Sequence, residues 1–267
     1  GDKGIQAGKT ILDRQQYAGD PPYEDEPNVD MLVLLFPVYA MDAPGRIYDW
    51  IAGSKEVKGI PAVVISISGG GEVFPNTACR GGCIKALEKK GYNVFYEDML
   101  VLPSNIFIGI HDHLAMRLLQ VLPFKVERIV SDALSGVGRR TRPKLSSRIM
   151  VKAIGNYEKK AVKGFGKYVR IEDSCTGCSW CAENCPNMNI AMEEGQPRFK
   201  NNCTACLRCL YGCPSKAIRM KKYEAFTVKE GYDLDGLERR MEGVELEPAE
   251  KFCKGIAWIG VRKYLFE

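Results

Sequence analysis

Through the first half of the chain, apolar runs of strand length alternate with segments whose apolar residues recur at helical spacing. Strands that alternate with helices are typical of a parallel sheet covered on both faces. We therefore predict an α/β fold for residues 1–138, with ligand loops at the carboxyl ends of its strands. The predicted strands cover residues 29–37, 60–68 and 93–102, and the predicted helices cover residues 43–51, 77–90 and 111–135.

The pattern changes after residue 138. Residues 139–170 hold eleven Lys or Arg and a single acid, Glu158, and we predict a basic helical linker there. A solvated helix, a docking face for an acidic redox partner and a membrane-surface segment all fit this charge. The absence of interleaved aromatic residues disfavours nucleic-acid binding. Residues 223–267 form a polar tail with a possible helix at 234–242.

The composition is that of an ordinary globular protein, with 45% hydrophobic residues, 27% charged residues and a net charge of +5. No stretch approaches the ~20 apolar residues that span a bilayer, and no signal peptide opens the chain. We therefore expect a cytoplasmic protein of two domains without a transmembrane segment. A reducing compartment makes metal ligation, and not disulfide bonding, the expected role of most of its eleven cysteines.

Eight of these cysteines form two runs of one pattern, C-x₂-C-x₂-C-x₃-C-P. This is the pattern of bacterial ferredoxins, in which the fourth cysteine of each run ligates the other of two iron–sulfur clusters. A chain that curls around a cubane can offer a thiolate about every third residue. We therefore expect two [4Fe–4S] clusters with crossed ligands. One would be held by Cys175, Cys178, Cys181 and Cys213, and the other by Cys203, Cys206, Cys209 and Cys185.

The two runs are an internal repeat with an offset of 28 residues, which carries Cys175 onto Cys203. The same offset carries Ile190 onto Ile218. It predicts a pseudo-twofold core in which a short strand lies on either side of each cysteine loop. The alternative ligand is zinc, but three cysteines at successive x₂ spacing would crowd one tetrahedral ion.

The remaining notable side chains are expected to be structural. Trp180 lies between two ligands and should pack over a cluster. Cys79 and Cys83 are four residues apart on a predicted helix, which favours buried packing over a redox-active thiol. Cys253 is isolated, and a surface or capping role is expected for His111.

Two loops of the first domain resemble the flavodoxin loops that embrace the isoalloxazine ring of FMN. One contains Pro37, Val38, Tyr39, Ala40 and Met41, and the other contains Ser68, Gly69, Gly70 and Gly71. The two loops are followed by the cysteine runs. This order, over residues 29–222, is similar to that of flavodoxin–ferredoxin fusion proteins of anaerobic bacteria and archaea. The resemblance implies a flavodoxin-like parallel sheet, FMN between the two loops, and a small α+β ferredoxin domain at residues 171–222.

The sequence departs from the family at the FMN phosphate. Flavodoxins bind that phosphate in a Ser/Thr- and Gly-rich loop after their first strand, and residues 1–28 contain no such loop. Residues 5–12 would correspond to the family's second strand, so the sheet is expected to be truncated at its N-terminus. A buried phosphate needs N–H and hydroxyl partners. We therefore expect this chain to bind FMN weakly or not at all, and a chain extended by one strand, loop and helix to bind it well.

Electron transfer is the function that these features predict. Single electrons would pass through two clusters, coupled to FMN in the intact arrangement, and an acidic redox protein is the expected partner class. One alternative is a plain ferredoxin carrier whose sheet domain only docks partners, and another is a flavin-dependent oxidoreductase. No acid–base pair or nucleophile marks a substrate site, so we assign no catalytic residue.

Overall fold

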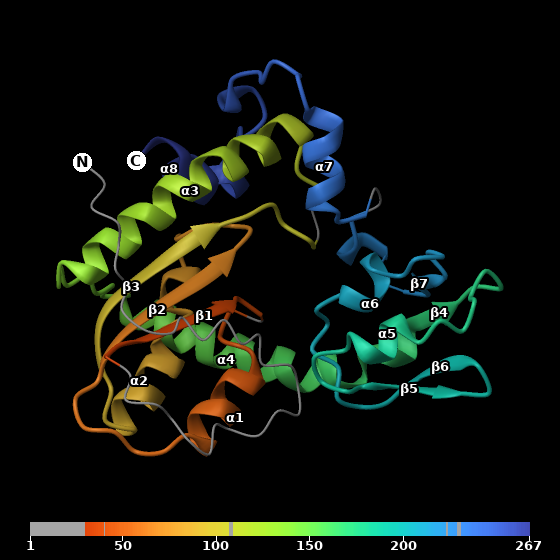
Figure 1. The fold of residues 1–267 in the computed structure, drawn as a ribbon, viewed down its shortest axis with the longest axis horizontal. Coiled ribbons are helices and arrows are strands. Elements are labelled where there is room, and N and C mark those ends of the chain that lie inside the picture. The colour runs from red at the N-terminus through yellow and green to blue at the C-terminus, as the bar shows by residue number, and fades with distance from the viewer. Residues whose placement is uncertain (1–29, 40, 107–108, 223, 229–230) are drawn as a thin grey trace.

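The computed structural model describes residues 30–39, 41–106, 109–222, 224–228 and 231–267. The chain forms a larger lobe built on a sheet and a smaller lobe that carries the cysteine runs (Figure 1). The predictions made for residues 1–28 and for Ala40 lie outside the described residues. Within the described residues, no helix combines the length and the apolar character that crossing a bilayer requires.

The larger lobe contains a three-stranded parallel sheet in the order β1-β2-β3, which confirms the predicted α/β architecture. Its strands are β1 (Leu32–Pro37), β2 (Pro61–Ser68) and β3 (Asn93–Val101). β2 lies in the middle, and its β-branched residues Val63, Val64 and Ile65 are buried on both faces. On β1, by contrast, Val33 and Leu35 are 61% and 53% exposed.

Helices cover both faces of the sheet, as the alternating pattern predicted (Figure 1). On one face, α1 (Gly45–Gly53) and α2 (Gly81–Lys89) enclose a core with Phe36 and Val64. On the other face, Ile129 of α3 (Asp112–Leu134) packs against Ile65 and Tyr96. A 3₁₀ turn, η1 (Asn76–Ala78), precedes α2, so this helix begins four residues later than residue 77, where the sequence placed it.

The C-terminal segment returns to the larger lobe. The expected helix is present as α7 (Leu234–Met241), and the chain ends in α8 (Ile259–Phe266). Val261 of α8 shares a core with Leu114 and Leu118 of α3 and with the buried Cys253. The short 3₁₀ segments of this region are η3 (Glu224–Phe226), η4 (Ala249–Lys251) and η5 (Ile256–Trp258).

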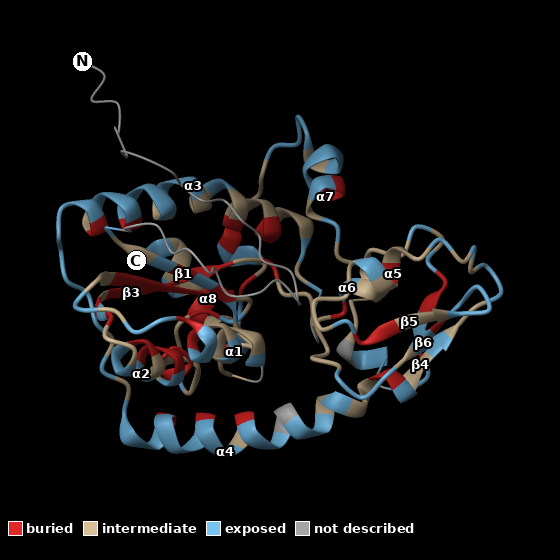
Figure 2. Cartoon of the chain, turned by 60° about the horizontal axis from the view of Figure 1, so that its bottom comes forward, coloured by how far each residue is buried: buried red, intermediate tan, exposed pale blue. Residues whose placement is uncertain are grey.

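The basic segment is largely helical, as expected. It forms α4 (Leu145–Ala161), which lies along one side of the larger lobe with most of its surface exposed, and continues as η2 (Val162–Tyr168) (Figure 2). Its start is fixed to the sheet, because the Thr141 N–H donates to Glu97 on β3 at 2.8 Å. The buried Arg80 also pairs with Glu97 at 2.8 Å.

The smaller lobe repeats one unit twice. The first unit is β4 (Val169–Ile171), α5 (Trp180–Glu183) and β5 (Ile190–Glu193). The second unit is β6 (Gln196–Phe199), α6 (Arg208–Tyr211) and β7 (Ile218–Met220). β4 pairs antiparallel with β7, and β5 with β6. Each unit therefore places one short strand on either side of its cysteine loop, and the strands of the two units pair with each other.

Candidate functional site

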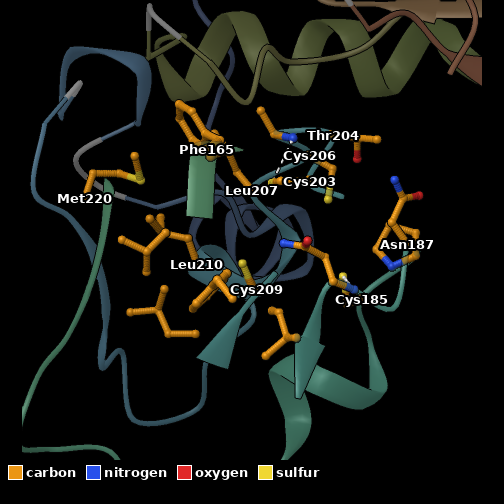
Figure 3. A pocket seen from close by; sticks show the side chains of 17 residues that line it. Phe165, Cys185, Asn187, Cys203, Thr204, Cys206, Leu207, Cys209, Leu210 and Met220 are labelled. Atoms are coloured by element: carbon orange, nitrogen blue, oxygen red, sulfur yellow. Dashed lines mark hydrogen bonds between the residues drawn. The ribbon is translucent and has the colours of Figure 1, made fainter. Parts of the chain in front are cut away.

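The eight cysteines of the two runs gather around two cavities in the smaller lobe. Each cavity receives three cysteines from one run and the fourth cysteine of the other run, which is the crossed grouping expected from the pattern. The second-run cavity is lined by Cys203, Cys206, Cys209 and Cys185 (Figure 3). The first-run cavity is lined by Cys175, Cys178, Cys181 and Cys213.

The two cavities are neighbours. The side chain of Ile218 lines both of them. Burial raises the pKa of Cys209 in the second-run cavity. The nearby Cys206 raises this pKa further, and so does Cys181, which lies across the shared wall. The sites are therefore close enough to interact electrostatically. Of the eight cysteines, Cys178 is the exposed one, so the first-run cavity lies nearer to solvent.

The cysteine loops adopt left-handed backbone at matching positions in the two repeats. A non-glycine residue in this region costs about 1 kcal/mol, so it persists only where the surroundings require it. Alternation of left- and right-handed residues turns successive N–H groups inward and makes a concave anion site of the kind found around iron–sulfur centres. The matching pairs are Gly177 and Ala205, with φ of 68° and 51°, Ser179 and Leu207, with φ of 64° and 59°, and Met188 and Lys216, with φ of 48° and 51°.

Backbone N–H groups also point at the sulfur atoms. The Asn189 N–H donates to Cys185 Sγ at 3.2 Å, and the Ala217 N–H donates to Cys213 Sγ at 3.3 Å. These two bonds are equivalent under the repeat. Burial alone would raise the pKa of Cys213, but hydrogen bonds from Ser215 and Ala217 together lower it. The Ser215 hydroxyl and the neighbouring backbone N–H groups therefore favour a thiolate at this position.

Among the described residues, no set of three or more His, Cys, Asp or Glu side chains stands close enough to hold one metal ion.

A family scan and searches of curated proteins and solved structures found no match. The assignment of the two cavities therefore rests on the residues that line them.

The first-run cavity has an aromatic wall. Trp180 lines it. The ring fits because residue 212 is glycine: a Cβ at Gly212 would lie 1.9 Å from the indole ring. In the second-run cavity the wall includes Phe165 of η2, which comes from the basic segment (Figure 3). No local sequence pattern indicates that contact.

The loops after β1 and β2 lie side by side at the carboxyl edge of the sheet. The Val38 N–H donates to Ile67 O at 2.8 Å, which joins the loop after β1 to the end of β2. Tyr39 and Asp42 exchange two backbone hydrogen bonds of 2.9 Å, and Met41 between them has a φ of 56°. Pro37 ends β1 and is exposed.

The glycine loop of this pair is packed against other parts of the chain. Ser68 Oγ accepts a hydrogen bond from the Gly70 N–H at 3.2 Å. A Cβ at Gly69 would lie 2.6 Å from the side chain of Ser104. Gly71, which has a φ of 76°, lies against the backbone of Gly260 in α8. The small size of these residues thus has a structural reason that the sequence did not reveal.

The sheet edge also contacts the second-run cavity. Tyr39 is close to Cys206: burial first, and then the charge of Cys206, raise the pKa of the Tyr39 phenol. Asn105, after β3, donates to Cys206 O at 3.5 Å and accepts from the Tyr211 hydroxyl through its own carbonyl at 2.7 Å. Tyr211 belongs to α6 beside Cys209. The carboxyl edge of the sheet therefore faces the second-run cavity.

The remaining cysteines lie outside both cavities. Cys79 and Cys83 are fully buried near the sheet, as expected, and Cys253 is buried under α8. His111 has the expected capping role, because its Nδ1 accepts from the His113 N–H at the start of α3.

Proposed function

We propose that this protein transfers single electrons through two [4Fe–4S] clusters. The first cluster would be held by Cys175, Cys178, Cys181 and Cys213, and the second by Cys203, Cys206, Cys209 and Cys185. The observation that supports this function best is the crossing: each cavity is lined by three cysteines of one run and the fourth of the other. Bacterial ferredoxins share their ligands in this way.

The chain's own contribution is to hold and tune these groups, which supply the redox chemistry when bound. The N–H···S bonds at Cys185, Cys203 and Cys213 stabilise negative charge on the sulfur atoms. The apolar walls, including Phe165 and Trp180, limit water around the sites. Adjacent cavities with a shared wall at Ile218 suit electron exchange between the two sites.

Anaerobic purification followed by iron and sulfide analysis tests the proposal. We expect about eight iron and about eight sulfide per chain, together with a broad visible absorption that dithionite bleaches. Zinc at about two per chain and no sulfide would overturn it in favour of structural metal sites.

A second proposal adds FMN at the carboxyl edge of the sheet, in a flavodoxin-like domain. The observation that favours it is the position of Tyr39, which lies in the loop after β1 and beside Cys206 of the second-run cavity. A flavin held by this loop would be coupled directly to that cavity. Structured flavin bands above the iron–sulfur absorption would support the coupled form. Their absence would favour a plain ferredoxin carrier.

A further inference from the structure

Exposed lysines adjoin the second-run cavity in the sequence of the segments that line it, and exposed acids adjoin the first-run cavity. Three of these lysines belong to the segments that carry Phe165 and Phe199, and we call them the basic face: Lys163, Lys167 and Lys200. Lys163 is next to the ligand loop, because its carbonyl accepts from the Cys203 N–H at 3.1 Å. Lys167 and Lys200 each follow one member of a close contact, because a Cβ at Gly166 would fall 2.5 Å from the side chain of Phe199, which lines the cavity.

The basic face has no internal counter-charge among the described residues. None of its three ammonium groups forms an ion pair there, and Lys167 instead lies over the ring of Tyr168 at 4.9 Å. Arg208 adds a further positive charge close to Cys206, whose pKa it lowers against the stronger effect of burial.

Three exposed acids lie close in sequence to residues that line the first-run cavity or pack against its loop: Asp173, Glu183 and Glu194. Glu194 is at the tip of the β5–β6 hairpin, whose Gly195 carbonyl would lie 2.9 Å from a Cβ at Gly177 in the first-run loop. We call these three acids the acidic face. The repeat shows the contrast directly, since Glu172 precedes Cys175 where Lys200 precedes Cys203.

We propose that an acidic one-electron carrier protein docks on the basic face and exchanges electrons with the second-run cluster. This inference rests on the electron-transfer function proposed above. One electron leaves the reduced carrier, which is oxidised, and enters the second-run cluster, which is reduced; no bond forms or breaks. Complementary charge accelerates encounter by about a hundredfold or more over neutral surfaces at low salt. The acidic face would repel the same carrier.

Stopped-flow kinetics of the loaded full chain test this docking surface. The probe is a purified small acidic plant-type ferredoxin, reduced beforehand, and the readout is bleaching of the iron–sulfur absorption. We expect the second-order rate constant to fall steeply between 0.02 and about 0.5 M NaCl, since screening shortens the reach of charge. The variant K163E/K167E/K200E should react at least about tenfold more slowly at low salt and lose most of its salt dependence.

Two further variants keep the outcome interpretable. The neutral variant K163Q/K167Q/K200Q should give an intermediate rate, and D173K/E183K/E194K, which reverses the acidic face, should react at least as fast as the wild type. Iron content and electron resonance spectra are measured for each protein. A protein without clusters defeats the proposed function itself. Loaded lysine variants that keep the wild-type rate, or an acidic-face variant that is slowed, overturn the docking proposal alone.

Discussion

Gly71 and Gly260 meet backbone to backbone, which places α8 directly on the glycine loop after β2. A Cβ at Gly71 would lie 2.6 Å from the carbonyl carbon of Gly260, and a Cβ at Gly260 would lie 2.0 Å from the carbonyl oxygen of Gly70. Neither position has room for a side chain. The C-terminal segment is therefore part of the packing of the sheet edge.

This contact predicts that Gly260→Ala destabilises the larger lobe. The added methyl group forces the backbones apart, and overpacking of this kind costs about 1–3 kcal/mol. The free energy of unfolding can be measured by anaerobic urea titration followed by circular dichroism. The matched control is Gly45→Ala, where a Cβ meets nothing within 4 Å, and which should be neutral or slightly stabilising. Equal stability of both variants would mean that α8 does not sit on the loop.

The crossed grouping predicts which cysteine substitutions damage the same cluster and therefore give similar electron resonance spectra. Cys185→Ser and Cys206→Ser should both damage the second-run cluster and give similar electron resonance spectra, because both side chains line that cavity. Cys178→Ser should lose the other signal. Cys253→Ser, which lies outside both cavities, should keep the full iron content. If Cys185→Ser instead matched Cys178→Ser, the fourth cysteine would ligate within its own run.

The aromatic wall of the first-run cavity can be tested through Gly212. Gly212→Ala places a methyl group where the Trp180 ring now lies, so the ring must move and the first-run cluster should be lost preferentially. Gly164→Ala is the control, because no atom lies within 4 Å of its added Cβ. The double variant G212A/W180F should recover part of the iron, since the smaller ring frees space. Full iron content in Gly212→Ala alone would contradict this packing.

Alkaline pH should weaken the larger lobe through Cys79. Burial raises the pKa of this thiol from 9.0 to about 11. The folded state therefore favours the protonated form: its contribution to stability is complete below pH 9 and is lost as the pH rises towards 11. Between pH 8 and pH 10, the wild type should lose about 1 kcal/mol more than Cys79→Ala. Parallel pH profiles of the two proteins, measured by urea unfolding, would show that Cys79 does not titrate in this range.

Binding of FMN by the 267-residue chain is predicted to be weak. The loops beside Tyr39 and Gly70 offer contacts to a ring, but no Ser/Thr- and Gly-rich phosphate loop occurs in the sequence, and an unpaired buried phosphate is costly. Titration followed by flavin fluorescence should give a dissociation constant above about 1 μM. Sub-micromolar binding would show that a phosphate site exists outside the loops recognised here.

Local sequence patterns predicted the strands and loops that residues close together in the sequence build. The β-branched run around Val64 predicted a buried strand, and the x₂ spacing from Cys203 to Cys209 predicted a loop that curls around a cavity. The same spacing, with the 28-residue offset, also predicted the repeated strands of the smaller lobe. These features were readable because residues near in sequence build them.

Long-range packing was not readable in this way. The glycine triplet at 69–71 suggested only a ligand loop, whereas Gly71 is small because Gly260 of the last helix lies against it. The pKa of Tyr39 is raised first by burial and then by the charge of Cys206, and this cysteine comes near Tyr39 only because the two lobes pack together. No periodicity or motif encodes either contact, since each depends on how distant elements pack.

The exchange of Cys185 and Cys213 between the two loops has a consequence for maturation. Under the proposed ligation neither site can be completed by its own run, so each waits for the other half of the lobe to be in place. Iron shortage should then divide the molecules into fully loaded and empty ones, with few carrying a single centre. Under this ligation, the supply of iron and sulfide would change the number of fully loaded molecules. It would leave the activity of each loaded molecule unchanged.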